Sequence, residues 1–110
     1  MKNDRAKFKV EFRKRLYNFS LELIKFLDKL PKDDVSRRIS DQVLRSGTSI
    51  LANYVEGQSA SSRKDFTNFL NHSLKSANES KIWLELLSDS NRVKKEDTEH
   101  FLKELDEVGN

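Results

Sequence analysis

The sequence of 110 residues contains no cysteine, one proline and three glycines. A chain without cysteine can form neither a disulfide nor a thiolate metal site. Proline and glycine are the residues that most often interrupt helices, so their scarcity among many lysines, glutamates and leucines favours long helices. No segment approaches the roughly 20 apolar residues that a membrane-spanning helix needs, and the first residues contain no apolar run suited to a signal peptide. We therefore expect a soluble cytoplasmic protein.

The net charge is only +3, although charged residues make up 35% of the chain. The two signs are separated, because lysine and arginine prevail in residues 1–16 while aspartate and glutamate prevail in residues 94–110. Near the N-terminus a row of basic residues recurs at helical spacing and consists of Lys2, Arg5, Lys9 and Arg13. Such a row can contact the phosphates of a nucleic acid, or it can pair with the acidic C-terminal segment of a neighbouring copy.

Apolar residues recur every three or four positions in four segments, which predicts amphipathic helices over about residues 4–30, 34–57, 62–88 and 94–108. Pro31 ends the first helix, and Gly57 is placed to end the second. The N-caps of the second and third helices are expected at Asp33 or Asp34 and at Ser61 or Ser62. Because the loops are short, consecutive helices should be antiparallel. We predict a single all-α domain over residues 1–110, an up-down-up-down four-helix bundle. The apolar stripe of its first helix consists of Phe8, Phe12, Leu16, Phe19, Leu23, Phe26 and Leu30.

The first and third helices carry more apolar surface than one core requires. A second set of residues lies away from the main stripe of each helix: Val10, Tyr17, Leu21 and Ile24 on the first, and Ile82, Trp83 and Leu86 on the third. These residues could pack under loops or under the fourth helix. Contiguous exposed apolar patches more often mark interfaces, so we favour self-association. Two different patches would suit a heterologous ring.

The segment LRSGTSILANYVEGQS, residues 44–59, is unusually small and polar. It lacks the spacing and the preceding strand of a phosphate-binding loop or a nucleophile elbow. Gly47 falls inside the second helix, at a cost of about 1 kcal/mol relative to alanine, which favours a close approach by another backbone. Arg45, Ser49, Asn53 and Glu56 form a polar row that is either solvated or hydrogen-bonded to a neighbouring helix or subunit.

Three runs of residues carry a family resemblance. They are the run from Arg45 to Gly57, the run SRKDF at residues 62–66, and the run ANESKIWLELL at residues 77–87. With the turn FLDKLPKDD they resemble the four-helix proteins encoded in intervening sequences of bacterial 23S ribosomal RNA genes. A relative is the accessory variability protein of diversity-generating retroelements, which associates with a reverse transcriptase and nucleic acid. The resemblance implies an antiparallel four-helix protomer, assembly into a homopentameric ring, and no catalytic residues.

No group of residues in the sequence indicates catalysis. His72 and His100 lack the spacing of a metal-binding motif, and no nucleophile, base and orienting group share a motif. We therefore expect that the protein is not an enzyme and has no small-molecule substrate. We also expect that it binds no cofactor, metal ion or membrane. The leading hypothesis is a non-catalytic oligomeric scaffold that binds RNA or DNA, or a protein such as a reverse transcriptase or ribosome-associated protein. The alternative is a protein–protein adaptor that binds no nucleic acid.

Overall fold

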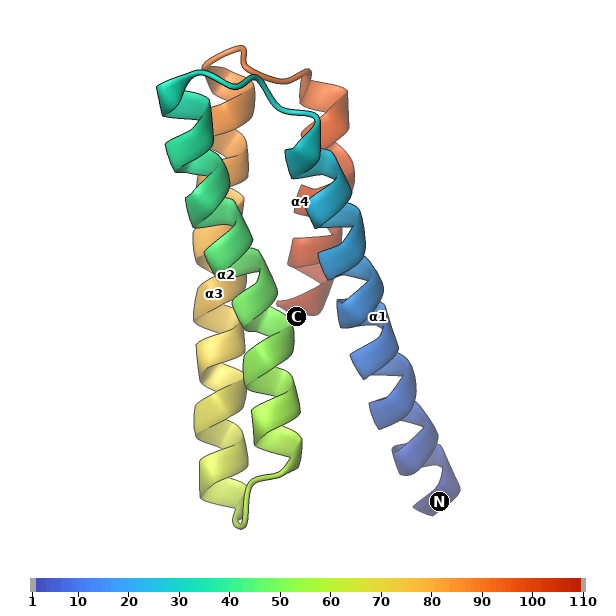
Figure 1. Ribbon diagram of the computed structural model, residues 1–110. Helices are drawn as coiled ribbons and strands as arrows, with labels where there is room; N and C mark the ends of the chain where they lie inside the picture. The colour runs from blue at the N-terminus through green and yellow to red at the C-terminus, as the bar shows by residue number, and fades with distance from the viewer. Residues whose placement is uncertain (1, 110) are drawn as a thin grey trace.

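The structure is a computed structural model that describes the backbone of residues 2–109 and the side chains of residues 4–109. Over this range the chain is all-α and contains no strand. Its helices are α1 (Lys2–Asp28), α2 (Asp34–Gln58), α3 (Arg63–Asp89) and α4 (Lys95–Val108). They run alternately up and down in an elongated bundle of 48 × 22 × 21 Å (Figure 1). No helix of the described residues is long and apolar enough to cross a membrane.

Side chains at the turns determine where α2 and α3 begin. The carboxylate of Asp33 accepts hydrogen bonds from the backbone N–H of Ser36 at 3.0 Å and from its hydroxyl at 2.7 Å. Ser62 caps α3 in the same way, because its hydroxyl accepts a bond from the backbone N–H of Asp65 at 3.1 Å. Each cap satisfies a backbone donor that has no partner within its helix, and so each gives its helix a defined start.

The two glycines of α2 have different roles from those the sequence suggested. Gly57 does not end α2, which continues to Gln58; Gly57 is buried because Phe66 and Phe69 of α3 lie against it. The close approach at Gly47 comes from a side chain of α1 and not from a backbone, because an added Cβ would overlap Cδ2 of Leu23. Both glycines therefore allow close helix packing.

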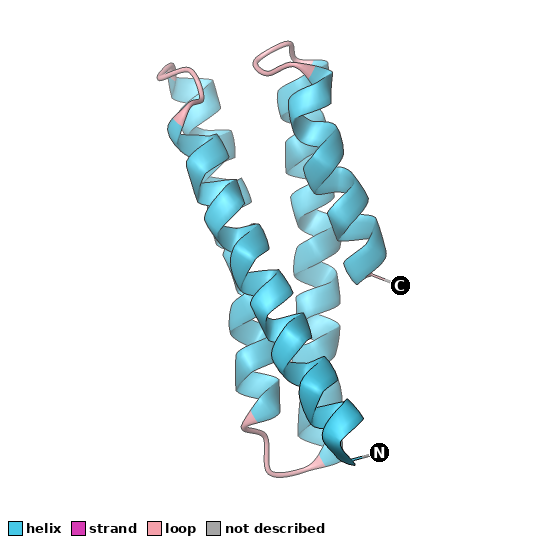
Figure 2. Cartoon of the chain, turned by 90° about the vertical axis from the view of Figure 1, so that its right-hand side faces the viewer, coloured by secondary structure: helices cyan, strands magenta, loops and turns pink. Residues whose placement is uncertain are grey.

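The helices pack in the order of the chain, α1 on α2, α2 on α3 and α3 on α4 (Figures 1 and 2). Aromatic rings also join α1 to α4, since Phe101 lies 5.8 Å from Phe19 and 5.1 Å from Phe26 between ring centroids. One cluster of buried side chains runs along the bundle axis and forms the core. Its members are Leu16, Phe19, Leu23, Leu30, Val43, Ile50, Tyr54, Ala77, Leu84, Leu87, Phe101 and Leu105.

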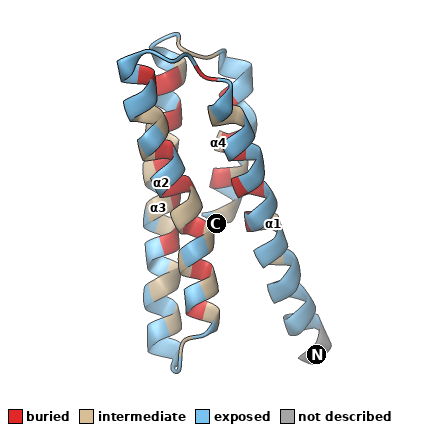
Figure 3. Cartoon of the chain, viewed as in Figure 1, coloured by how far each residue is buried: buried red, intermediate tan, exposed pale blue. Residues whose placement is uncertain are grey.

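The fourth helix is short and leaves part of the bundle uncovered. α4 has 14 residues, whereas α3 has 27, so α4 ends part-way along the bundle (Figures 1 and 2). The N-terminal part of α1 leans away from α2 and α3 and is mostly exposed (Figure 3). Phe8, which the apolar pattern assigned to the core, is therefore 64% exposed. That assignment was wrong because no fourth helix covers this part of the bundle.

Candidate interaction surfaces

The N-terminal part of α1 carries the predicted basic row. Arg5, Lys9 and Arg13 are all exposed, and none of them takes part in the ion pairs formed among residues 4–109. The side chain of Lys2, the fourth predicted member, lies outside the described residues. Unpaired cations on a solvated helix face keep their charge available to an external anion.

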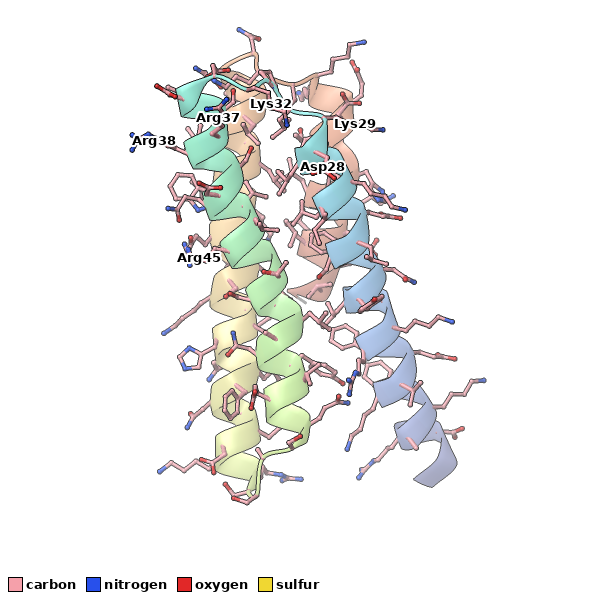
Figure 4. The ribbon with its side chains drawn as sticks, in the orientation of Figure 1. Asp28, Lys29, Lys32, Arg37, Arg38 and Arg45 are labelled. Atoms are coloured by element: carbon pink, nitrogen blue, oxygen red, sulfur yellow. The ribbon has the colours of Figure 1, made fainter. Side chains whose placement is uncertain are left out.

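A second basic surface surrounds the turn between α1 and α2, and the sequence analysis did not identify it. Lys29 and Lys32 precede α2, while Arg37 and Arg38 lie in its first turns, all of them exposed (Figure 4). Lys32 donates to the carbonyl of Asp28 at 3.2 Å, which holds its ammonium near the end of α1. The concentration of cations in residues 29–38 was a signal for this surface, but the intervening proline and aspartates obscured it.

Several acidic residues of α4 are paired within the chain. Arg15 of α1 donates to both carboxylate oxygens of Glu104 at 2.7 Å and to Glu107 at 2.6 Å. Lys81 of α3 lies 2.7 Å from the carboxylate of Asp106. The hydrogen bonds and charge of Arg15 hold the pKa of Glu104 below its ordinary value, and Glu104 in turn raises the pKa of Arg15. These carboxylates are thus less available to the basic row of a neighbouring copy.

The polar row of α2 bonds mainly to its own helix. The hydroxyl of Ser49 donates to the carbonyl of Arg45 at 2.6 Å, and the amide of Asn53 donates to the carbonyl of Ser49 at 2.9 Å. Only Arg45 reaches another helix, where its guanidinium pairs with Glu79 of α3. Glu56 is exposed. The ends of the row, Arg45 and Glu56, are therefore solvated, whereas Ser49 and Asn53 are half-buried and bond to their own helix.

Buried hydroxyls instead connect α2 to α3. Ser80 Oγ lies 2.8 Å from Ser46 Oγ, and the Ser46 hydroxyl donates to the carbonyl of Gln42 at 2.9 Å. Further along, the hydroxyl of Ser73 donates to the carbonyl of Ile50 at 2.9 Å. Helical periodicity places these serines in line with core residues of α2 and α3, but it does not show which of them pair. Because every one of these hydroxyls has a partner, the contacts define the register of α2 against α3.

The predicted second apolar sets remain exposed on the protomer, so they do not pack under loops or under α4. Exposed fractions on α1 run from 39% at Ile24 to 66% at Val10, and Tyr17 and Leu21 lie between them. On α3, Ile82 and Leu86 are exposed as well. Trp83 differs, because it is half-buried against the core and its indole N–H donates to Glu79 at 2.9 Å. We name the two exposed sets the α1 stripe (Val10, Tyr17, Leu21, Ile24) and the α3 patch (Ile82, Leu86).

The two apolar surfaces have opposite charges beside them. One helical turn from residues of the α1 stripe lie four cations and one carboxylate: Lys7, Arg13, Lys14, Lys25 and Asp28. One turn from the α3 patch lie Glu85 and Asp89. The two surfaces therefore match each other in both apolar character and charge.

The histidines lie at the surface and far apart in the chain. His100 Nε2 is 2.8 Å from a carboxylate oxygen of Glu22, a contact that links α4 to α1. His72 is exposed on α3. Within the part of the chain that the structure describes, no three acidic, histidine or cysteine residues are grouped so that they could hold a metal ion.

Comparisons with known proteins give the chain its family. Among curated proteins, no sequence matches it. A solved structure from Bacteroides thetaiotaomicron, described as a protein of unknown function from the S23 ribosomal protein family, is 42% identical. It matches with a TM-score of 0.69 over 92% of this chain and 87% of that chain. The family model of the 23S rRNA-intervening sequence protein matches residues 9–110. The chain therefore belongs to the 23S rRNA-intervening sequence protein family.

Proposed function

We propose that this protein is a non-catalytic oligomeric scaffold that binds RNA through the basic row of α1. The observation that carries the proposal is the position of Arg5, Lys9 and Arg13 on a helix segment that leans away from the bundle without ion-pair partners among residues 4–109. Cations presented in this way neutralise phosphates and release counterions from a nucleic acid. The family description names the intervening sequence of 23S rRNA, which makes ribosomal RNA the first ligand to test.

The proposed assembly is a ring in which the α1 stripe of one subunit packs on the α3 patch of the next. The apolar character of both surfaces and the opposite charges beside them support this heterologous contact. The family resemblance implies five subunits. Repetition around a ring would bring several basic rows into one assembly, so a single RNA could contact more than one of them.

The test is salt-titrated binding of a 23S rRNA fragment. The triple variant Arg5→Glu, Lys9→Glu, Arg13→Glu should reduce the slope of log affinity against log salt by about 2–3, because each lost phosphate contact contributes about 0.7–0.9. A matched control makes the same charge change on α3, with Arg63→Glu, Lys64→Glu and Lys75→Glu, and should keep most of the binding.

Two results would contradict the RNA proposal. If the unmodified protein binds no RNA at low salt, the alternative of a protein–protein adaptor takes its place. If the control variant loses as much binding as the α1 variant, the affinity reflects overall charge and not the basic row.

A further inference from the structure

An open apolar groove of about 710 Å³ lies beside the C-terminal end of α4. Its floor comes from all the longer helices: Phe8 and Phe12 of α1, Tyr54 of α2, and Phe66 and Leu70 of α3. The end of the groove nearest α4 is lined by Val108, the last residue of that helix. The groove therefore lies where α4 would run if it continued past Val108.

The aromatic rings of the floor are already packed against one another. Phe8 and Phe12 stack with their ring centroids 5.8 Å apart, and Phe12 meets Tyr54 edge-on at 5.0 Å. Phe8 is nevertheless 64% exposed, because nothing within residues 4–109 covers its outer side. The groove is thus a preformed apolar surface, and a partner that covered it would be stabilised by the burial of that surface.

The rim of the groove shows which charges an occupant would meet. Arg5 and Lys9 line it on the α1 side together with Asp4, about two to three helical turns from Arg15, and Glu107 lines the end next to α4. Arg15 itself holds the carboxylates of Glu104 and Glu107 from α4. α4 is an amphipathic helix with acidic residues beside its apolar face, and its contacts show that this chemistry fits against α1.

We infer that the groove binds an amphipathic helix of a partner protein whose apolar face is flanked by aspartate or glutamate. α4 is 13 residues shorter than α3 (27 against 14), which leaves about 20 Å of the bundle, or three to four helical turns, without a fourth helix. An occupant of that length would bury Phe8 and place its carboxylates beside Arg5 and Lys9. This is recognition of a helix by a groove, with α4 as the pattern for the bound helix.

Within residues 4–109, none of the helices α1, α3 and α4 of a second copy suits the groove. The α1 stripe is flanked by Arg13, Lys14 and Lys25, which would face the basic rim. The α3 patch has acidic neighbours but spans only the single turn from Ile82 to Leu86. The apolar face of α4 is buried in its own bundle.

Single-stranded RNA also fits the groove less well than a helix does. Phe12 lies against Phe8 and meets Tyr54 edge-on, so of these three rings Phe8 is the exposed one, whereas binding of successive bases needs several exposed rings. The inference rests on the proposed function only in that Arg5 and Lys9 belong to both surfaces. Its test therefore changes Phe8, which is not part of the basic row.

The test uses a fluorescent 14-residue synthetic helix, with leucines every third or fourth position and glutamates beside them, and follows its anisotropy. The full-length protein should bind this peptide. Phe8→Lys should weaken binding about tenfold or more, because the partly exposed ring loses its burial in the complex. Leu44→Lys, which places a lysine at an exposed leucine of α2 outside the groove, the α1 stripe and the α3 patch, should leave the affinity unchanged. A peptide with lysine in place of every glutamate should not bind.

Several outcomes would overturn the inference. They are no binding of the acidic peptide to the protein, equal binding of the peptide by Phe8→Lys, or equal weakening by Leu44→Lys. A smaller solution mass of Phe8→Lys would show instead that a second copy occupies the groove. Loss of oligouridylate binding in Phe8→Lys, without peptide binding to the unmodified protein, would assign the groove to RNA. If Phe8→Lys loses the peptide but keeps the rRNA fragment, the groove and the basic row act separately and the inference stands.

Discussion

Leu23 of α1 occupies the space that a side chain at Gly47 of α2 would need. Leu23 is completely buried, so a side chain at Gly47 would force it to shift within the core. Ser80 of α3 lies on the same side of Gly47, which places this glycine where α1, α2 and α3 meet. The small residues around Gly47 therefore serve helix packing in the middle of the bundle.

Gly47→Leu should destabilise the protein by about 1–3 kcal/mol or more, because the new side chain overpacks a filled core. The measurement is the midpoint of thermal unfolding, followed by circular dichroism. Ala52→Leu is the matched control, since Ala52 lies exposed on the same helix and should tolerate a leucine. An unchanged melting temperature and oligomer size for Gly47→Leu would mean that the contact with Leu23 is not tight.

Ser46 and Ser80 should be coupled across the α2–α3 interface. Ser80→Ala removes a buried hydroxyl and should cost about 0.5–1.5 kcal/mol of unfolding free energy. In a double-mutant cycle with Ser46→Ala, the two losses should not add, because both variants remove the same hydrogen bond. Strict additivity in urea unfolding would show that the hydroxyls act independently.

The pair of Arg15 with Glu104 should make stability depend on acid pH. The folded-state pKa of Glu104 is lowered from 4.5 by its hydrogen bonds to Arg15. Stability from this pair is thus fully present above about pH 4.5 and is lost as pH falls through the lower folded-state pKa.

Glu104→Gln should lower the unfolding free energy at pH 7 by about 1 kcal/mol, since the pair is bidentate but partly exposed. The difference from the unmodified protein should shrink below pH 4.5. Glu11→Gln is the control, because Glu11 and Lys7 are 4.0 Å apart at the surface and their pairing should contribute nothing measurable. A difference that persists unchanged at low pH would exclude the carboxylate charge as its source.

The α1 stripe should be required for self-association. Tyr17→Asp with Leu21→Asp places charges on exposed apolar residues, so helicity should stay intact while the mass in light scattering falls to that of a monomer. Ile82→Asp with Leu86→Asp should have the same effect, because a head-to-tail contact needs both surfaces.

Asn18→Asp is the control for a new charge on α1, since Asn18 is exposed and lies off the stripe. The assembly should keep its mass in this variant. An unchanged mass of the stripe variants would mean that the α1 stripe is not an interface.

The candidate surfaces could be predicted only in part. The spacing of Arg5, Lys9 and Arg13 placed them on one helix, and the structure adds that this part of α1 leans away from the bundle. The apolar excess of α1 and α3 was also visible in the sequence, but the half-burial of Trp83 was not. Its burial depends on the core that packs against α3, and helical periodicity carries no information about neighbouring helices.

The sequence by itself determined the helices and their order, because periodicity and Pro31 are local signals, and it limited each N-cap to two residues, of which the structure selects Asp33 and Ser62. Only the tertiary structure decided which side chain fills the space at Gly47, which serines pair, and that Phe8 stays exposed below the end of α4. The physical reason is that local periodicity fixes the face on which a residue lies, whereas burial depends on what another part of the chain brings to that face.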